Sequence, residues 1–537
     1  MGQISWGMMD RRRFIQLSVV LAGLGKWLSS CTPKKAVGGK IVGASAEIGH
    51  LVRDRRFGAP SEIIKKEVVI VGGGVSGLSA ARHLHRSGKD FLLLDLEKAM
   101  GGNAAHGSNS ISPYPWGAHY VPLPNNELTE YLDFLRSCGV ITGNDAAGLP
   151  IYREEYLCFA PEDRLYINGR WQDGLVPQFG VPAGEQKQIQ RFLELMDAFR
   201  QQKGSDGRDA FAIPAGESSR DEAFTRLDTI TMKEWLETNG FPSPYLHWYV
   251  NYCTRDDFGT PVDKVSAWAG IHYFASRKGK AANAERYNVL TWPEGNGWLV
   301  QQLQQGLEEK MRNNCLAVAV KHTEDTVLVD YFDVRQEKLV RVEAEHCIMA
   351  IPQFVASRLL GDGARTELAK GLQYVPWMVA NLVVDKLKER SGTAPSWDNV
   401  LYNGKGLGYI DATHQLLQQH TGARNLTYYL PLTEGGVAEE RKAAQQRTHE
   451  DWVRIVLDDL LPVHPDLGSS LREANIMIWG HSMPQPLPGM IYGGLRDKLS
   501  ASVDGRIHFA HTDLAGVSIF EEGFYQGLNA AKKIISA

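Results

Sequence analysis

The strongest constraint on the fold of this chain is a glycine-rich turn that directly follows a short apolar run. Every residue of Val68–Val71 is β-branched, which predicts a buried strand of a parallel sheet. Gly72–Gly74 and Gly77 then complete the pattern G-x-G-x-x-G. A helical apolar pattern continues over residues 78–84. The stretch therefore predicts the strand, turn and helix that open a βαβ unit.

Each position of the turn has a physical role in such a unit. Gly72 permits the tight turn, Gly74 lets a pyrophosphate approach the backbone, and Gly77 lets helix and strand pack closely. Val75 and Ser76 lie at the helix N-terminus, which carries roughly half a positive charge and faces the phosphates. These roles predict that the turn binds the diphosphate of a dinucleotide.

A second apolar run, Phe91–Leu94, ends at Asp95, with Leu96 beside it. An acid about twenty residues after the glycine turn can hydrogen-bond an adenosine ribose. A βαβ unit without a nucleotide would explain the glycines but not the acid. Asp95 therefore favours a dinucleotide-binding unit over a generic one.

A second glycine pair, Gly101-Gly102, follows the acid. The arrangement resembles the "E-x-x-x-x-x-G-G" signature of the flavin-containing amine oxidoreductase superfamily, which includes monoamine and polyamine oxidases, L-amino-acid oxidases, protoporphyrinogen oxidase and carotenoid desaturases. The resemblance implies an α/β fold, in which an FAD-binding Rossmann-like domain of the GR2 type carries an inserted α+β substrate domain. The family usually has Arg where this chain has Asn103, so one cationic contact to FAD is missing.

The stretch Tyr114–Tyr120 is similar to a strand that passes beside the isoalloxazine ring in the family. Gly117, Ala118 and His119 are therefore candidate flavin neighbours. A histidine held in the core by ordinary hydrogen bonds is the alternative interpretation of His119.

An antiparallel meander is predicted by three runs that alternate apolar and polar residues, Leu316–Val320, Thr326–Phe332 and Leu339–Glu343. A buried strand is then predicted over His346–Ala350. The meander and the following "I-x-A-I-P" resemble the family's pattern. The resemblance implies that Val320 contacts the adenine side and that Ala350 borders the cofactor.

The last segment resembles the closing strand and helix of the family. Arg506–Asp513 is similar to a strand that delivers an acid to the ribityl chain, which makes Asp513 that acid, and Ser518 follows in the next turn. Glu522-Gly523 marks the predicted helix start. Backbone N–H groups there can stabilise negative charge at the N1–C2=O edge of the reduced ring.

The domain division follows from these elements. Residues 1–31 are expected to form an export signal and residues 32–65 a tether. The FAD-binding domain is expected to comprise residues 66–122, 290–352 and 497–537, and the substrate domain residues 123–289 and 353–496. Within the substrate domain, helices are predicted over Glu127–Ser137, Gln186–Gln202, Thr231–Thr238, Tyr245–Thr254 and Asp451–Leu461, and a strand over Trp377–Val384. A further helix is predicted from the Trp298 region to Met311.

The resemblance also implies the chemistry. Members of the superfamily remove a hydride from a C–H next to nitrogen, or from another activated C–H, toward flavin N5. A pocket of apolar and aromatic residues favours a neutral amine by desolvation, and the free lone pair then supports the developing positive charge. Besides His119, the candidate pocket residues are Trp116, Trp377, Trp479 and Phe520.

Two catalytic features of the family have only approximate counterparts. Phe520 lies two residues before Glu522, where amine oxidases often place a tyrosine of their aromatic cage, and it lacks the hydroxyl. Many members also hold a water at flavin N5 with a lysine after the A-I-P strand. Spacing puts Arg358 near that place and Lys370 further on.

The cysteines and the single glycine turn restrict the cofactor and the electron donor. No cysteine follows Cys347, which excludes a cysteinyl flavin bond from the C-terminal region, so FAD is expected to bind non-covalently. A second strand–helix G-x-G-x-x-G is absent, so a small-molecule substrate rather than NAD(P)H is expected to donate electrons. Oxygen or a membrane-associated carrier would accept them. The alternatives are an FAD enzyme acting on a lipid-like or isoprenoid substrate, and a non-catalytic protein that keeps FAD for stability.

The N-terminus resembles an export signal. Arg11–Ile15 precedes a modest apolar run, Leu17–Leu24, which is shorter than the roughly 20 residues of a membrane span. The paired arginines resemble the bacterial twin-arginine signal, and Leu28–Cys31 resembles a lipobox. These features predict export by the twin-arginine machinery to the periplasm, with Cys31 as a candidate lipid anchor. A basic N-terminal helix and an ordinary cysteine near a cleavage site are the alternatives.

Composition limits the remaining classes. With 537 residues the chain is long enough for two or more domains. A net charge of −4 without a basic stripe argues against nucleic acid as a partner. The six cysteines are scattered without C-x-x-C, and no metal-ligand cluster is visible.

Overall fold

The predicted first strand is the centre of a seven-stranded sheet. β1 (Glu62–Val71) lies parallel to β2 (Phe91–Leu94) and to β14 (Lys338–Met349). The strand order is β11-β2-β1-β14-β13-β12, and β20 (Ile507–Phe509) pairs with β14. Val68 and Ile70 belong to one hydrophobic cluster, whereas Val69 and Val71 belong to another. Burial on both faces explains why the run is apolar at every position.

The structure, a computed structural model, describes residues 37–418 and 422–536. The predicted export signal and Cys31 lie outside the described residues. All described helices and strands belong to the unit Gly39–Ala537. None of the described helices has the length and apolar character needed to cross a bilayer.

The predicted meander is present, with one difference in its last strand. β12 (Cys315–His322), β13 (Val327–Asp333) and β14 pair antiparallel in sequence order. Two strands were expected over 339–350, but β14 is continuous, because its first half pairs with residues 62–66 and its second half with residues 68–71 of β1. The same pairing extends β1 back to Glu62, into the predicted tether.

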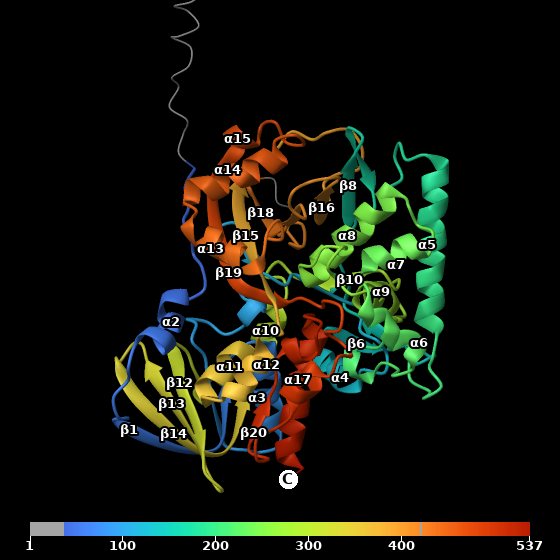
Figure 1. Cartoon of the computed structure of the whole chain (residues 1–537). Coiled ribbons are helices and arrows are strands. Elements are labelled where there is room, and N and C mark those ends of the chain that lie inside the picture. Colours follow the sequence, from blue (N-terminus) through green and yellow to red (C-terminus); the bar gives the residue numbers. More distant parts are fainter. Residues whose placement is uncertain (1–36, 419–421, 537) are drawn as a thin grey trace, which may run out of the picture. The chain divides into compact units, whose positions relative to one another are not determined.

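Three helices cover one face of this sheet. α3 (Val75–Arg86) connects β1 to β2 and contacts α10 (Gly297–Gln304) and α17 (Phe520–Ile535). Figure 1 shows α17, in red, beside α3 and β20. α10 ends well before Met311, where the helix was predicted to end, because Gln305 leaves the helical region with ψ 125° and Gly306 follows with φ +76°.

A second seven-stranded sheet carries the substrate side. Its order is β19-β15-β18-β17-β16-β8-β9. The strands are β8 (Asp163–Ile167), β9 (Arg170–Asp173), β15 (Tyr374–Val384), β16 (Asp398–Leu401), β17 (Tyr409–Asp411), β18 (Arg424–Pro431) and β19 (Leu471–Pro484). All eleven residues of β15 are buried.

The five helices predicted between residues 127 and 461 are present, each with bounds within about four residues of the prediction. They are α4 (Thr129–Ser137), α5 (Ala183–Gln201), α7 (Met232–Thr238), α8 (Pro244–Phe258) and α14 (His449–Leu460). A sixth helix, α9 (Ala267–Ala275), was not predicted. Ser243 caps the N-terminus of α8 and Pro244 occupies its first turn, close to the predicted start at Tyr245. The helix runs past the predicted end at Thr254, because the left-handed residue that ends it is Gly259. α5, α8 and α9 share one hydrophobic cluster with the sheet residues Trp377, Val400 and Tyr429.

The remaining elements are short or peripheral. The helices are α2 (Ala46–Asp54), α6 (Glu222–Thr225), α11 (Gln353–Leu360), α12 (Gly363–Ala369), α13 (Val437–Gln446), α15 (Leu467–Ser470) and α16 (Leu495–Ser500). The strands are β3 (His106–Ser108), β4 (Pro113–Pro115), β5 (Tyr120–Pro122), β6 (Ile141–Asn144), β7 (Pro150–Tyr152), β10 (Val289–Thr291) and β11 (Met311–Arg312). The predicted assignment of segments to two domains stays a prediction.

Candidate active site

The glycine turn is built for close backbone packing. Gly72 has φ +107°, and a Cβ added to it would overlap the carbonyl oxygen of Ala350. A Cβ at Gly77 would in turn overlap the carbonyl oxygen of Gly72. Only glycine fits these two positions, as the sequence pattern requires. Ala350 therefore borders the turn.

The second glycine pair packs against the first. The Gly101 N–H donates to the Gly73 carbonyl at 2.9 Å, and Gly74 forms an isolated parallel bridge with Gly101. A Cβ on Gly74 would lie 4.0 Å from the Cα of Gly102. Gly74 is the N-cap of α3 and no side chain caps that helix. The N-terminal N–H groups of α3 are thus available to a phosphate.

Asp95 is hydrogen-bonded to the backbone of the glycine turn. Its Oδ2 accepts the Gly73 N–H at 2.5 Å and its Oδ1 accepts the Glu97 N–H at 2.7 Å. Burial raises the pKa of this carboxyl to about 6, against the effect of the two hydrogen bonds. Each oxygen keeps a lone pair that can accept a ribose hydroxyl. The neighbouring Leu96 packs against Gly49 of α2.

The adenine-side contact expected of the Val320 backbone stays a prediction. Val320 pairs with Val329 inside the meander ladder and is buried in the core. The backbone that lies beside Asp95 and Glu97 belongs to Asn314 and Cys315. Val320 is five residues further along β12, a separation of about 16 Å in an extended strand.

The C-terminal segment that contains Asp513 packs against the start of α3, next to the glycine turn. The sequence predicted that these two motifs bind one cofactor. The Asp513 side chain is fully buried, and its Oδ2 accepts the Tyr374 hydroxyl at 2.6 Å and the Gln353 N–H at 2.8 Å. In the described chain its Oδ1 has no hydrogen bond, although the Nδ1 of His511 lies 3.2 Å away. A Cβ at Gly523 would contact both Val75, at 3.3 Å, and Thr512, the residue before Asp513.

The helix start was predicted two residues too late. α17 begins at Phe520, and no side chain caps it. Glu522 lies in the first turn, where its N–H has no partner within the helix, while its carboxylate accepts the Ala215 N–H. The Ser518 hydroxyl lies 3.1 Å from that of Thr512 in the preceding turn.

These donors and acceptors fit FAD. Two uncapped helix N-termini, those of α3 and α17, offer N–H groups to a diphosphate and to a carbonyl edge. Asp95 and the unused oxygen of Asp513 are acceptors for sugar and polyol hydroxyls. The chemistry of this donor set matches a molecule that has a diphosphate between a ribose and a ribityl chain.

A cavity of about 130 Å³ adjoins these residues. Its lining includes the predicted residues Asn103, Gly117, Ala118, His119, Trp377, Trp479, Ser518 and Phe520. The Asn103 side-chain amide donates to the Ser482 carbonyl at 2.5 Å. The backbone carbonyl of Asn103 accepts the Ala118 N–H. The structure therefore brings together most of the predicted flavin neighbours.

Aromatic side chains form two walls of the cavity. Trp377 of β15 and Trp479 of β19 are direct partners across the sheet. The Trp479 Nε1–H donates to the Trp116 carbonyl at 2.7 Å, which fixes its ring. The Tyr429 hydroxyl donates to the Gly117 carbonyl at 2.9 Å. Phe520 completes the lining at the start of α17.

His119 is held as a neutral ring. It lies 4.7 Å from the Tyr429 ring and 5.6 Å from the Trp397 ring, between centroids. Its Nδ1 is 3.3 Å from the Gly117 carbonyl. Burial lowers the pKa of His119 to about 4. The side chain is therefore uncharged at neutral pH. His119 lines the cavity and also packs among buried aromatic rings, so both interpretations of this histidine remain open.

Five titratable residues of the cavity were not found from the sequence. They are Tyr120, Asp256, Asp257, Arg277 and Glu521. The Arg277 guanidinium donates to both oxygens of Asp257, at 2.6 and 2.8 Å. The Tyr120 hydroxyl lies 3.3 Å from Asp256 Oδ2. One signal was present: two adjacent acids in the last turn of α8 oppose the helix dipole, which normally disfavours them there.

Arg358 and Lys370 do not reach the cavity. Arg358 is exposed on α11, on the side that faces Asp54, and it is not part of the cavity lining. Lys370 is also exposed and pairs with Glu367. Spacing after the A-I-P strand misplaced the cation, because α11 turns that part of the chain away from the cavity. The cationic side chain that does line it is Arg277.

A family model described as flavin containing amine oxidoreductase matches residues 75–535. The chain belongs to this family. Membership agrees with the glycine turn, with the two acids Asp95 and Asp513, and with the cavity. It makes the protein an FAD-dependent oxidoreductase, as predicted.

Relatives of the family share the sequence only distantly. L-amino acid oxidase Bs29 of Bothriechis schlegelii is 22% identical over 405 residues, 74% of each chain. Amine oxidase [flavin-containing] B of Sus scrofa is 24% identical over 307 residues, which cover 55% of this chain and 52% of that one. A solved double mutant of putrescine oxidase has a TM-score of 0.64 at 16% identity, covering 88% of this chain and 100% of the other. The predicted fold class is thereby confirmed.

Proposed function

We propose that this enzyme removes a hydride from a carbon next to the nitrogen of an amine. The observation that carries the proposal is the charge of the cavity. Among the described residues that line it, three carboxyl side chains, Asp256, Asp257 and Glu521, accompany one guanidinium, that of Arg277. Arg277 is already paired with Asp257. The other two acids favour a ligand that brings a positive charge.

The walls of the cavity suit an amine that reacts in its neutral form. Bound FAD supplies the hydride acceptor at flavin N5. The rings of Trp377, Trp479 and Tyr429 exclude water around the substrate, which lowers the cost of an uncharged nitrogen. The neutral ring of His119 adds no positive charge that would repel the substrate.

The same charges rank the alternative substrates. An amino acid would bring a carboxylate, whose natural partner, Arg277, is engaged with Asp257. A lipid-like or isoprenoid substrate would leave Asp256 and Glu521 buried against hydrocarbon, which is costly for carboxyl groups. We therefore place amines first, amino acids second and isoprenoids third.

The test is anaerobic reduction of the purified holoprotein. Flavin absorbance is followed after mixing with n-butylamine, benzylamine and 1,4-diaminobutane, with L-amino acids, and with an isoprenoid hydrocarbon. The matched control is n-butanol, which has the chain of butylamine without the nitrogen. Bleaching by amines and not by the alcohol is expected. Bleaching by the isoprenoid alone, or by nothing, would contradict the proposal.

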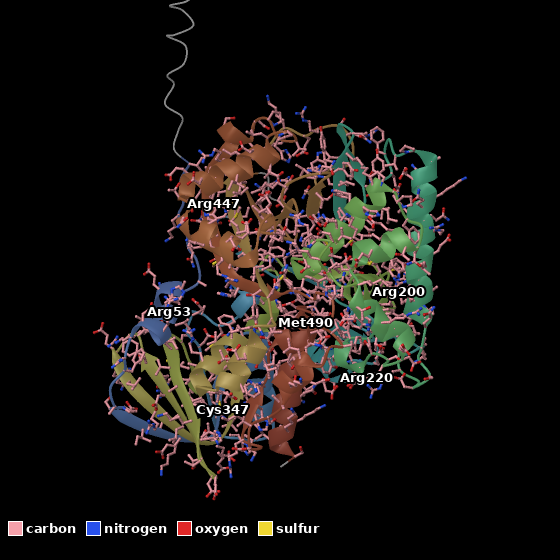
Figure 2. The ribbon with its side chains drawn as sticks, in the orientation of Figure 1. Arg53, Arg200, Arg220, Cys347, Arg447 and Met490 are labelled. Atoms are coloured by element: carbon pink, nitrogen blue, oxygen red, sulfur yellow. The ribbon has the colours of Figure 1, made fainter. Side chains whose placement is uncertain are left out.

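We propose further that FAD is bound without a covalent link. The five described cysteines are free, and none lines the cavity. Cys347 lies within β14 in the first sheet (Figure 2), and burial raises the pKa of its thiol to about 12. Acid precipitation should release all the FAD into the supernatant. A pellet that stays yellow would refute non-covalent binding.

We also propose export by the twin-arginine route, with oxygen or a membrane-associated carrier as electron acceptor. The support is the sequence of residues 11–31 alone. Replacing both Arg11 and Arg12 with Lys should hold the holoprotein in the cytoplasm. Replacing Cys31 with Ser should move an anchored protein from the membrane fraction to the soluble periplasmic fraction, and an unchanged distribution would argue against the anchor.

A further inference from the structure

A row of acidic side chains continues from the cavity into the second sheet. Asp256 lines the cavity at the end of α8. Tyr252 lies one turn earlier on the same face of α8, and its hydroxyl donates to Oδ2 of Asp398 at 3.2 Å. Asp398 of β16 and Asp163 of β8 are direct partners in a parallel pair. Their side chains therefore project from the same face of the sheet, about 5 Å apart at the backbone.

The outer end of the row approaches the surface at Glu162. The Asp398 N–H donates to the Glu162 carbonyl at 2.8 Å, which holds the two residues together. The Glu162 carboxylate accepts from the side chain of Asn288. Tyr287, the residue before Asn288, is 75% exposed. The row thus leads from the cavity to a partly exposed carboxyl beside the exposed Tyr287.

A second observation comes from the inner end of the cavity. Glu521 is 1% exposed and lines the cavity, and in the part of the chain that the structure describes its Oε2 has no hydrogen-bond partner. A buried carboxyl oxygen without a partner is costly unless a ligand or a proton occupies it. The cavity therefore keeps an acceptor that the protein itself does not use.

The surroundings of Asp256 contain more acids than cations. The titratable groups that interact with it are Tyr252, Cys253 and Asp257 of α8, Tyr120 of β5, Arg277, Asp398 of β16 and Tyr429 of β18. Asp163 of β8 interacts in turn with Asp398. Burial first, and then the charge of Asp257, raises the pKa of Asp256 to about 7. Burial also raises the pKa of Asp163 to about 6 and that of Glu162 to about 7. Groups of this kind exchange protons readily at neutral pH.

We propose that Asp256 takes the proton from the ammonium group of the incoming substrate, and that Tyr252, Asp398 and Asp163 pass it outward to Glu162. The inference rests on the proposed amine substrate. One N–H bond breaks, its electron pair stays on nitrogen, and the proton forms an O–H bond on the Asp256 carboxylate. Release of one proton to solvent at Glu162 restores the anion. The step leaves a neutral amine in the cavity and involves no oxidant or reductant.

The first test replaces the acceptor. Asp256→Asn has the same shape and cannot take the proton. In the holoenzyme at pH 7, flavin bleaching by the primary amine that reduces the wild type fastest should slow by about 100-fold or more. The rate should recover as the pH is raised, because the free amine then becomes abundant. An unchanged rate and pH profile would overturn the inference. A wild type that no amine bleaches would instead refute the proposed function.

A measurement without substrate separates the two claims. The infrared C=O band of a protonated carboxyl, which titrates through about pH 7 in the wild-type holoenzyme, should weaken in Asp256→Asn. Identical titration in wild type and variant would overturn the role of Asp256 whatever the substrate proves to be.

The second test addresses the outward path. Asp398→Asn and Tyr252→Phe should delay proton release, read by a pH indicator in weak buffer, relative to flavin bleaching. Tyr245→Phe is the matched control, because Tyr245 lies on the same helix, stacks on Tyr402 and does not line the cavity. Release that stays coupled to bleaching in all three variants would overturn the path. If Asp398→Asn weakens only 1,4-diaminobutane and not n-butylamine, with the pH profile unchanged, the row is a second ammonium site and the relay is refuted.

Discussion

Single carboxyl groups control both ends of this site, and each has a different task. Asp95 is tied to the backbone by the N–H groups of Gly73 and Glu97, so it is a structural part of the turn as well as an acceptor. The Asp256 carboxylate accepts a single side-chain hydrogen bond among the described residues, from the Tyr120 hydroxyl at 3.3 Å, so its second oxygen is free to take a proton. The surroundings, and not the residue type, separate a binding acid from a reactive one.

Replacing Asp95 with Ala should weaken both FAD retention and the fold. Two N–H groups lose their acceptor, at a cost of about 1–3 kcal/mol for each one that stays buried. The FAD retained after gel filtration and the urea midpoint measure the two effects. Asp90→Ala is the control, because Asp90 is exposed and its carboxylate pairs with Lys66 at the start of the same unit. The Asp90 N–H, which donates to Glu67, is retained in that variant. Equal retention in the two variants would refute the ribose assignment.

Replacing Asp256 with Asn should stabilise the holoprotein at alkaline pH. The folded pKa of Asp256 is raised to about 7 from 3.8, so its contribution to stability is full below the unfolded pKa and is lost as the pH rises through about 7. Asparagine has no charge to bury. The gain in melting temperature of the variant over wild type should therefore appear between about pH 4 and 7 and then level off. A difference that is constant with pH would contradict this account.

At the scale of secondary structure, the packing of α17 on α3 brings together two helices that are far apart in the sequence. A Cβ on Gly527 would overlap the carbonyl oxygen of Ser76, and a Cβ on Gly523 would press on Val75. Ser79 also donates its hydroxyl to the Phe524 carbonyl at 2.7 Å. These close approaches place the first turns of both helices beside the same cofactor. Helix contact therefore positions two phosphate- and ring-facing N-termini at once.

Gly527→Ala should push these helices apart. The added methyl meets backbone atoms of Ser76 and Ala80, which cannot rotate away as a side chain could. We expect a loss of about 1–3 kcal/mol in the free energy of unfolding, with weaker FAD retention. Gly363→Ala in α12 is the control, because nothing lies within 4 Å of its added Cβ. A variant at Gly527 that melts and retains FAD like the control would refute the packing argument.

At the scale of the whole molecule, buried acids and buried histidines have opposite effects on how the stability of the fold depends on pH. Burial raises the pKa of Glu162, Asp256, Glu521 and Glu522 to about 7. Burial lowers the pKa of His119, His272, His464, His481 and His508 to about 4. The histidines contribute stability that is present above their unfolded pKa of 6.5 and is lost as the pH falls toward 4. The acids contribute stability that is lost as the pH rises through about 7.

The holoprotein should therefore lose stability when the pH rises through about 7, where only the acids still titrate. Chemical denaturation at a series of pH values measures the free energy of unfolding directly. The Asp256→Asn variant should show a smaller loss than the wild type over the same range. A free energy that increases through pH 7 would contradict the assignment of these buried acids.

Sequence patterns located the cofactor side well and the substrate side poorly. The glycine turn, Asp95 and Asp513 stand in short motifs whose spacing is set by local geometry, and the structure brings them together. Arg358 was placed by counting along the chain, and α11 exposes it away from the cavity. Val320 was placed by analogy, and its contact stays a prediction. Asp256, Arg277 and Glu521 belong to no short motif. They meet only because α8, the segment after α9 and α17 converge.

The sequence by itself determined the parallel sheet, the diphosphate turn and the family, because each depends on residues close together in the chain. Strand pairing, glycine conformation and helix starts are local, so their signals survive in the order of residues. Only the tertiary structure decided which acids face the cavity, which of them lack a counter-ion, and how Asp256 connects to Asp398 and Asp163. Those properties depend on burial and on neighbours from distant segments, and both are set by packing.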